Sequence, residues 1–399
     1  MKIAFVTPHS ASWPAGSFSG DLMAHVTGLG RALAERGHRV VIYTRKDCPD
    51  LPAERTLAPG LTVRHLPAGP AEPLQATDEA RHIGEFSRRL VAHWRQSRPE
   101  IVHALYWTSG LAALLAARDY PVPVVQTFGS LATAERRAGL PGPARDARMK
   151  MEAVVARMAA GVLATSTAEA SALATLGIRP ASVRVVPCGV ETGRFSPGRR
   201  PERCPGPARL LHLAGLGPHD GADLAISLLT ELPGVVLSLA GEKPGGRRGG
   251  DLGAARLGKL AATLGVADRV SFTGPVTERR LPTVLRSADM LICTSRHDPL
   301  GLTSIRAMAC GTPVAAIETG GSADAVIDGI TGLLGRPGAP QDLARRLQEV
   351  VSTPMKLAAF GIAAADRARS RYPWERISHE AAAEYESCIA RQPERLRAA

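Results

Sequence analysis

The stretch MLICTSRHDPLGLTSIRAMACGTPVAAI, residues 290–317, contains the pattern that decides the fold. It begins and ends with short apolar runs, which are typical of buried β-strands. Between them, apolar residues at helical spacing over 301–309 predict an α-helix that starts directly after a turn containing Pro299 and Gly301. A strand, a helix and a second strand in this order predict a parallel βαβ unit.

The same alternation runs through the rest of the chain and predicts an α/β fold with two open parallel sheets. The other predicted strands cover residues 2–8, 39–45, 61–66, 101–105, 123–128, 161–166, 183–190, 210–215, 234–241 and 269–274. The other predicted helices cover residues 20–36, 78–97, 109–118, 146–158, 221–231, 253–264, 278–286, 322–328, 340–351 and 374–390.

One segment interrupts this alternation. RFSPGRRPERCPGPA, residues 194–208, is rich in proline, glycine and arginine and has few apolar residues, which predicts a linker. A chain of 399 residues is also long enough for two domains. We therefore expect one Rossmann-like domain over residues 1–195 and a second over 206–373.

Composition narrows the class of protein. The net charge of +12 comes almost entirely from arginine, which indicates charge spread over solvated surfaces or attraction to phosphate-bearing ligands. No basic run is interleaved with aromatic residues, so we expect no nucleic-acid partner. No apolar run reaches membrane-spanning length, and the first residues lack the pattern of a signal peptide. The six cysteines are scattered without a CxxC pair, which predicts neither a zinc site nor a disulfide framework and favours the cytoplasm.

Ligands of open parallel sheets bind beyond the carboxyl ends of the strands. The loops that follow the predicted strands are therefore the candidate ligand sites. Residues 269–334, which include several of these loops, resemble the C-terminal signature of the family-4 retaining glycosyltransferases, which have the GT-B fold. Residues 29–45, 100–107 and 183–198 are similar to N-terminal segments of the same family. The resemblance implies an acceptor domain followed by a nucleotide-sugar domain, and a final helix over 374–399 that returns to the first domain.

The resemblance and the loop positions together give the candidate donor-binding residues. At the start of helix 301–309, unpaired backbone N–H groups would suit a diphosphate, although an ordinary packed turn has the same sequence pattern. The candidates are Gly20, Asp21, Gly215, Asp220, Lys243, Gly274, Pro275, Leu300, Gly301, Leu302 and Arg306.

The sequence departs from the family at charged positions. Asp298 and Arg306 match the two carboxylates of the family's Glu-x7-Glu pair, and arginine cannot accept a hydrogen bond from a ribose hydroxyl. Gly215 and Asp220 match the arginine and lysine that grip the leaving diphosphate. A replacement cation is therefore expected, and Arg306 is a candidate because arginine binds phosphate bidentately. Lys243, Arg247 and Arg248 are further candidates, unless their loop is simply a solvated turn.

The candidate catalytic residues are Asp298, His103 and Arg306. Asp298 has an alternative role as a helix cap. His103 lies in a predicted strand, and its alternative role is that of a hydrogen-bonded core histidine. The candidate acceptor-binding residues are His9, Tyr106, Gln126 and Thr127.

These features predict a metal-independent, retaining glycosyltransferase, with a nucleotide-sugar as co-substrate and no further cofactor. The acceptor would be a small molecule of a bacterial specialised-metabolite pathway, such as antibiotic biosynthesis, or of a small-thiol pathway, and the protein a monomer or homodimer. The alternative is a pseudo-glycosyltransferase that couples an unusual substrate or acts without sugar transfer. A dinucleotide oxidoreductase is disfavoured, because the loop GLGPHDG (215–221) only approximates a dinucleotide-binding motif.

Overall fold

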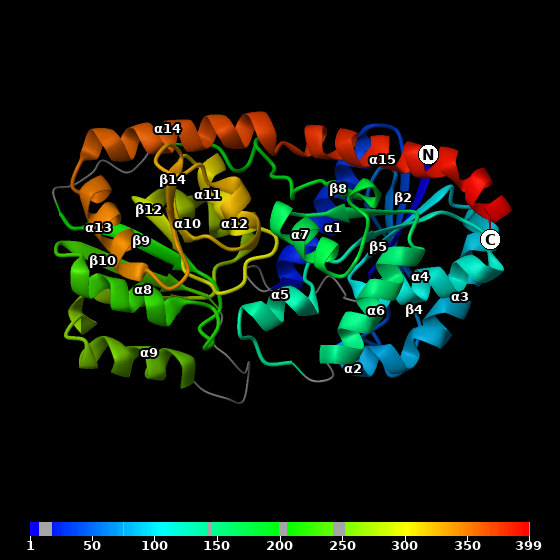
Figure 1. Ribbon diagram of the computed structural model, residues 1–399, viewed down its shortest axis with the longest axis horizontal. Helices are drawn as coiled ribbons and strands as arrows, with labels where there is room; N and C mark the ends of the chain where they lie inside the picture. Colours follow the sequence, from blue (N-terminus) through cyan, green and yellow to red (C-terminus); the bar gives the residue numbers. More distant parts are fainter. Residues whose placement is uncertain (8–17, 75, 143–144, 199–205, 242–251, 399) are drawn as a thin grey trace. The chain divides into compact units, whose positions relative to one another are not determined.

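A computed structural model describes residues 1–7, 18–74, 76–142, 145–198, 206–241 and 252–398. These residues form two compact units. Residues 1–7, 22–187 and 374–398 form unit 1, and residues 18–21 and 188–373 form unit 2. Each unit has one sheet with helices on both faces (Figure 1), so the expected α/β class with two parallel sheets is confirmed.

The sheet of unit 1 has eight strands among the described residues, in the order β3-β4-β2-β1-β5-β6-β7-β8. All neighbouring pairs are parallel except β3 and β4. The strands are β1 (Lys2–Val6), β2 (Arg39–Arg45), β3 (Glu54–Ala58), β4 (Leu61–Leu66), β5 (Ile101–Leu105), β6 (Val124–Thr127), β7 (Gly161–Ala164) and β8 (Val183–Val185). The helices are α1 (Phe18–Glu35), α2 (Ala76–Glu79), α3 (Ile83–Ser97), α4 (Trp107–Asp119), α5 (Ala132–Arg137), α6 (Arg145–Met158), α7 (Thr167–Thr175) and α15 (Trp374–Ala398).

The sheet of unit 2 has six strands among the described residues, all parallel, in the order β11-β10-β9-β12-β13-β14. The strands are β9 (Ala208–Leu213), β10 (Val235–Ala240), β11 (Val270–Gly274), β12 (Met290–Cys293), β13 (Val314–Ile317) and β14 (Gly332–Gly335). The helices are α8 (Ala222–Leu228), α9 (Leu252–Thr263), α10 (Leu281–Ser287), α11 (Leu302–Ala309), α12 (Gly320–Ala325), α13 (Pro340–Val351) and α14 (Pro354–Arg371).

The cores explain why these segments fold as they do. Central strands such as β5 are buried on both faces, and all side chains of β5 except His103 are therefore apolar. In α13, Pro340 occupies the first turn, where its missing N–H costs nothing, and Leu343, Leu347 and Val350 form a buried stripe at helical spacing. Burial of each such leucine stabilises the unit by about 1.5–3 kcal/mol.

The last helix belongs to unit 1, although the chain has passed through unit 2 before reaching it. The Trp374 ring lies against Gly28 of α1, where a Cβ would be only 2.3 Å from the ring. Farther along α15, the Tyr385 hydroxyl contacts His103 of β5. The long segment of unit 2 begins at residue 188, and close to its start Val190 donates its N–H to the Tyr372 carbonyl over 2.8 Å.

Several element predictions were wrong in their bounds. The strand predicted over 183–190 ends at Val185, and Pro187 lacks the N–H that a continuing parallel strand would need. The helix predicted over 322–328 covers Gly320–Ala325 instead, and the final helix continues past residue 390 to Ala398. Five elements were not predicted: β3, β14, α5, α7 and α14.

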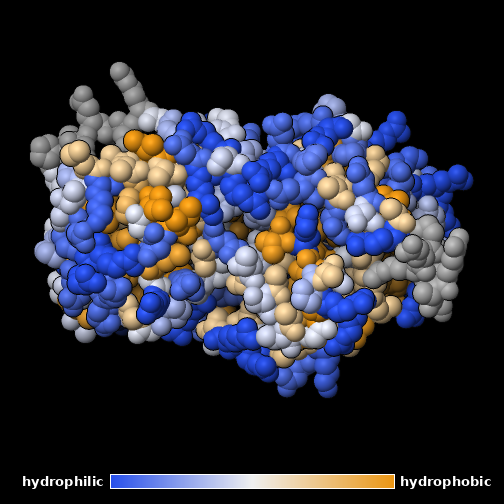
Figure 2. All heavy atoms as spheres, turned by 45° about the horizontal axis from the view of Figure 1, so that its top comes forward, coloured by the Kyte–Doolittle hydropathy of each residue, from blue (hydrophilic) through white to orange (hydrophobic). Residues whose placement is uncertain are grey.

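The helices and the surface of the described residues show two further features. Among the described residues, no helix combines the length and apolarity needed to cross a bilayer. Hydrophobic side chains gather on part of the unit 2 surface (orange in the left half of Figure 2), and the most exposed large apolar residues of that unit are Met355 and Ile362 of α14.

Candidate active site

The turn that leads into α11 is built by close packing of backbone on backbone. Gly301 has a φ of 62°, and a Cβ on it would lie 2.4 Å from the carbonyl carbon of Gly321. Gly321 donates its N–H to the Asp298 carbonyl over 2.8 Å. Only glycine tolerates both the positive φ and the close approach, so these glycines fix where α11 begins beyond the carboxyl end of β12.

Asp298 stabilises this turn with both oxygens of its carboxylate. Oδ1 accepts the Gly301 N–H over 2.9 Å, and Oδ2 accepts the Ser322 hydroxyl. Burial raises the pKa of Asp298, and these two hydrogen bonds partly oppose the rise. The prediction of unpaired N–H groups at Leu300, Gly301 and Leu302 is therefore wrong for Gly301. The Leu300 and Leu302 side chains are buried in the core of unit 2.

Arg306 lies in the same helix and is already ion-paired. Its side chain is only 9% exposed, and Nη1 is 3.2 Å from Oε1 of Glu278 and 3.9 Å from Oδ1 of Asp21. The guanidinium lies over the Phe195 ring, 5.3 Å from its centroid. Arg194 contacts the other oxygen of Glu278 over 2.9 Å. Glu278 is thus held by two arginines, and its carboxylate balances part of the Arg306 charge.

The loop after β9 carries a second departure from the family pattern. Asp220 accepts the Gly217 N–H over 2.7 Å, and a Cβ on Gly215 would lie 2.2 Å from Oδ2 of Asp220. The Asp220 carboxylate therefore occupies space that any side chain at position 215 would need. The departures from the family pattern at positions 215 and 220 are therefore structurally coupled, because the Asp220 carboxylate leaves room only for glycine at position 215.

The remaining donor candidates lie at the same edge or outside the described residues. Gly274 ends β11 with a φ of 70°, directly before Pro275, and its carbonyl accepts the Gly241 N–H over 3.1 Å. Gly20 and Asp21 lie in the first turn of α1. The candidates that fall outside the described residues are Lys243, Arg247, Arg248, the acceptor candidate His9, and residues 199–205 of the expected linker.

In unit 1, His103 has the environment of a core residue. It is fully buried, its Nε2 lies 2.8 Å from Oγ1 of Thr127, and its Nδ1 lies 2.7 Å from the Tyr385 hydroxyl. Burial, together with the nearby His25, lowers the pKa of His103 to about 3. Both ring nitrogens have partners within unit 1, so the geometry favours the core interpretation over proton transfer.

The acceptor candidates Tyr106, Gln126 and Thr127 come together where β5 and β6 end. Tyr106 has a φ of 78°, which is strained for a bulky residue and is often found at functional sites. Its N–H donates to the Thr127 carbonyl over 2.8 Å, and its carbonyl accepts from Gln126 Nε2 over 3.1 Å. The Arg148 guanidinium lies over the Tyr106 ring, 5.3 Å from its centroid.

Several residues near these candidates were not predicted from the sequence. Arg148 and Glu278 belong to ion-pair clusters that only the folded chain assembles. Arg45 ends β2, and Thr108 and Ser109 lie in the first turn of α4. The loop after β2 also follows the carboxyl end of a strand in an open parallel sheet, so its position is the one signal in the sequence that points to Arg45.

Comparisons with known proteins agree with this architecture. Residues 24–194 match the model described as Glycosyltransferase Family 4, and residues 199–367 match the model described as Glycosyl transferases group 1. A D-inositol 3-phosphate glycosyltransferase from Nocardiopsis dassonvillei is 33% identical, over 98% of this chain and 95% of its own. Its counterpart from Streptomyces bingchenggensis is 34% identical, over 94% of this chain and 87% of its own.

Solved structures show the same fold. Sucrose-phosphate synthase from Thermosynechococcus elongatus superposes with a TM-score of 0.88 at 26% identity, covering 98% of this chain and 99% of its own. Anabaena HepE, solved with UDP and glucose, has a TM-score of 0.75 at 20% identity, covering 97% of this chain and 100% of its own. The chain therefore belongs to the family-4 (group 1) glycosyltransferases and has the GT-B fold.

Proposed function

We propose that this protein transfers a sugar, with retention of configuration, from a nucleotide-activated donor to a hydroxyl group of a small-molecule acceptor. The observation that carries the proposal is the match to named glycosyltransferases along nearly the whole chain, including both domains. Unit 2 would bind the donor and unit 1 the acceptor. The pathway would be one of bacterial specialised metabolism, and the transfer would need no metal.

In this scheme the acceptor oxygen bonds to the anomeric carbon as the bond from that carbon to the diphosphate breaks. The acceptor proton passes to the departing phosphate oxygen, so atoms and charge balance. Asp298 would accept a hydrogen bond from a donor-sugar hydroxyl through lone pairs that Gly301 and Ser322 leave available. The first turn of α11 would face the diphosphate with its backbone N–H groups.

Charge on the leaving diphosphate needs a cation, and we assign that role to Arg306. In the structure Arg306 is paired with Glu278, but Arg194 also contacts Glu278. Arg306 can therefore exchange Glu278 for phosphate without leaving that carboxylate unpaired. This exchange would compensate for Gly215 and Asp220, which stand where the family has cations.

One observation favours the alternative, a pseudo-glycosyltransferase. The Arg306 charge is already balanced by Glu278, and the Asp220 carboxylate occupies the position of a missing cation. A protein that no longer stabilises a leaving diphosphate has no need of a free cation there.

The test begins with thermal unfolding in the presence of ADP, GDP, UDP and their glucose conjugates, with and without EDTA. We expect at least one of these ligands to raise Tm and EDTA to have no effect. Transfer to candidate acceptors is then followed by mass spectrometry, and the anomeric configuration of the product by NMR. If the folded protein binds a nucleotide-sugar without ever releasing nucleoside diphosphate, the alternative is correct.

A further inference from the structure

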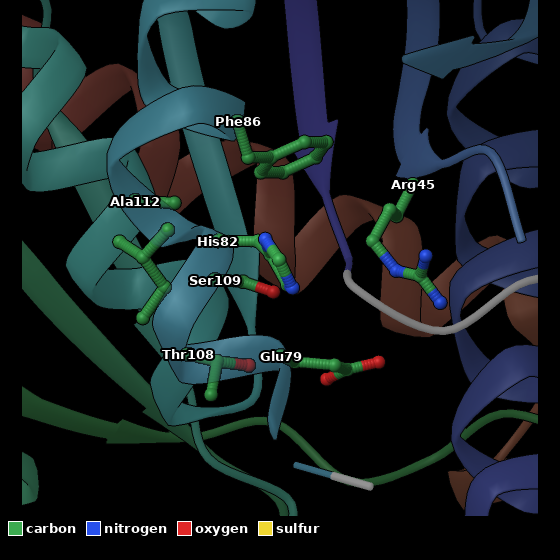
Figure 3. A pocket seen from close by; sticks show the side chains of 8 residues that line it. Arg45, Glu79, His82, Phe86, Thr108, Ser109 and Ala112 are labelled. Atoms are coloured by element: carbon green, nitrogen blue, oxygen red, sulfur yellow. The ribbon is translucent and has the colours of Figure 1, made fainter. Parts of the chain in front are cut away.

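Unit 1 contains a pocket whose described lining includes none of the sequence-based candidates. It lies at the carboxyl edge of the sheet, between Arg45 at the end of β2 and the first turn of α4, with an apolar wall that includes Phe86 (Figure 3). Counted together with the adjoining open solvent, the space at this pocket that no atom fills is about 300 Å³. β1 lies between β2 and β5, and the chain winds outward from it in both directions. This is the switch point at which open α/β sheets bind ligands.

Three buried side chains of this pocket have polar atoms without a hydrogen-bond partner. They are Nε of Arg45, Oγ1 of Thr108 and Oγ of Ser109, and the three residues are at most 4% exposed. Buried polar atoms are almost always hydrogen-bonded, because leaving one unpaired costs about 1–3 kcal/mol. The other guanidinium nitrogens of Arg45 hold the Pro70 and Glu72 carbonyls, so Nε is kept in place.

The start of α4 adds backbone donors to this set. The first three N–H groups of a helix have no intrahelical partner, and the N-cap residue Tyr106 provides no side-chain cap. Thr108 and Ser109 lie in that first turn, so their hydroxyl groups and the backbone donors are close together. A hydroxyl both donates and accepts, and the pocket therefore offers donors and acceptors side by side.

The charges around the pocket do not favour an anion. Glu79 also lines it, and burial raises the pKa of this carboxyl group to about 7, with Arg45 lowering it and Asp47 raising it further. Arg45 is therefore accompanied by two carboxyl groups. Near Tyr106, Arg148 is balanced in the same way by Glu135 and Glu152, at 2.8 and 2.7 Å.

Building on the proposed function, we propose that the Arg45–Thr108–Ser109 pocket binds hydroxyl groups of a neutral, polyhydroxylated acceptor, such as a cyclitol or a monosaccharide. Mixed donors and acceptors beside an apolar wall suit vicinal hydroxyls on a carbon ring. A phosphate would meet the carboxyl group of Glu79 beside Arg45 in the lining of this pocket. The acceptor would then differ in charge from the phosphorylated compound in the relatives' name.

The test measures binding of four neutral compounds: myo-inositol, glucose, mannose and galactose. It also measures binding of myo-inositol 3-phosphate, glucose 6-phosphate and inorganic phosphate. Calorimetry is run on the full chain with and without UDP. Thr108→Val and Ser109→Ala remove the pocket hydroxyls. Thr133→Val is the matched control, because Thr133 Oγ1 is also buried without a partner but does not line the pocket.

We expect at least one neutral compound to bind, with an affinity about five- to tenfold lower in each pocket variant and unchanged in the control, as for one lost hydrogen bond. Tm should not fall, because these hydroxyl groups have no partner to lose. The proposal is overturned if no neutral compound binds, if a phosphorylated form or inorganic phosphate binds more tightly, or if the pocket variants bind as the wild type does. UDP binding, read separately, tests the donor proposal and does not depend on these outcomes.

Discussion

Replacing Arg306 tests whether its charge serves the fold or the diphosphate. At 3.2 Å from Glu278, the gross attraction is about 5 kcal/mol at an effective dielectric constant of about 20, before desolvation is subtracted. Glu278 is 43% exposed and keeps Arg194 as a partner. We therefore expect Arg306→Met to lower the free energy of unfolding by only about 1–2 kcal/mol.

Arg306→Glu should cost more, about 3–5 kcal/mol, because it places a nearly buried carboxylate beside Glu278 and Asp21. The double variant Arg306→Glu/Glu278→Arg should recover part of that loss. Urea unfolding measures these differences. Loss of activity in Arg306→Glu alone is therefore no evidence for a phosphate contact.

The informative comparison is nucleoside diphosphate binding by Arg306→Met, which stays folded. If Arg306 binds the diphosphate, affinity should fall about tenfold or more, as for a lost charge-assisted hydrogen bond. Glu278→Gln is the control, and its affinity should be unchanged or higher, since it releases Arg306. Arg306→Met with wild-type affinity would refute the role assigned to Arg306, and Arg306→Glu with wild-type stability would refute the electrostatic account.

Three further predictions follow from the same geometry. Asp298→Asn should lower the melting temperature only slightly, because the amide oxygen can still accept the Gly301 N–H and only the hydrogen bond from the Ser322 hydroxyl is lost. Turnover should fall about 10²-fold. Early melting with normal turnover would leave Asp298 a purely structural residue. His103 has a pKa of about 3 in the folded protein against 6.5 in the unfolded chain, so its contribution to stability is present above pH 6.5 and is lost as pH falls toward 3. Between pH 7 and 5, the free energy of unfolding of the wild type should fall by about 2 kcal/mol more than that of His103→Gln, as measured by urea unfolding. Equal decreases in the two proteins would contradict this. Gly215→Arg should destabilise the protein, because the new Cβ would lie 2.2 Å from the Asp220 carboxylate. The double variant Gly215→Arg/Asp220→Lys should melt at a higher temperature than this single variant. Equal melting temperatures would show that the two positions are not coupled.

The fold could be predicted largely because its signals are local. The apolar runs of β5 and β12 and the stripe of α13 depend only on which residues are buried, and hydrophobic periodicity reports that directly. β14 was missed because its short segment, Gly332–Gly335, has glycine at both ends. Gly332 is required there by its approach to Val314, where a Cβ would lie 2.0 Å from the carbonyl oxygen, and such a contact cannot be read from the sequence.

The candidate site was predictable in position but not in partners. Pro299 and Gly301 indicated the turn before α11, yet the Gly301 N–H proved to be occupied by Asp298, a contact set by the path of the turn. His103 was found by residue type, and only the packing of α15 on β5 shows that Tyr385 takes its second ring nitrogen. The pocket at Arg45 was missed because unpaired buried atoms are a property of tertiary packing.

The central claim is that the protein uses a nucleotide-sugar as a glycosyl donor. The most direct measurement is a reaction of the folded protein with UDP-, GDP- or ADP-glucose and the neutral acceptor panel, in which nucleoside diphosphate and glycosylated product are quantified together by mass spectrometry. The account predicts that the two appear in equal amounts with at least one donor and that both decrease in Asp298→Asn. Tight donor binding with neither product, or product formation that is unchanged in Asp298→Asn, would contradict it.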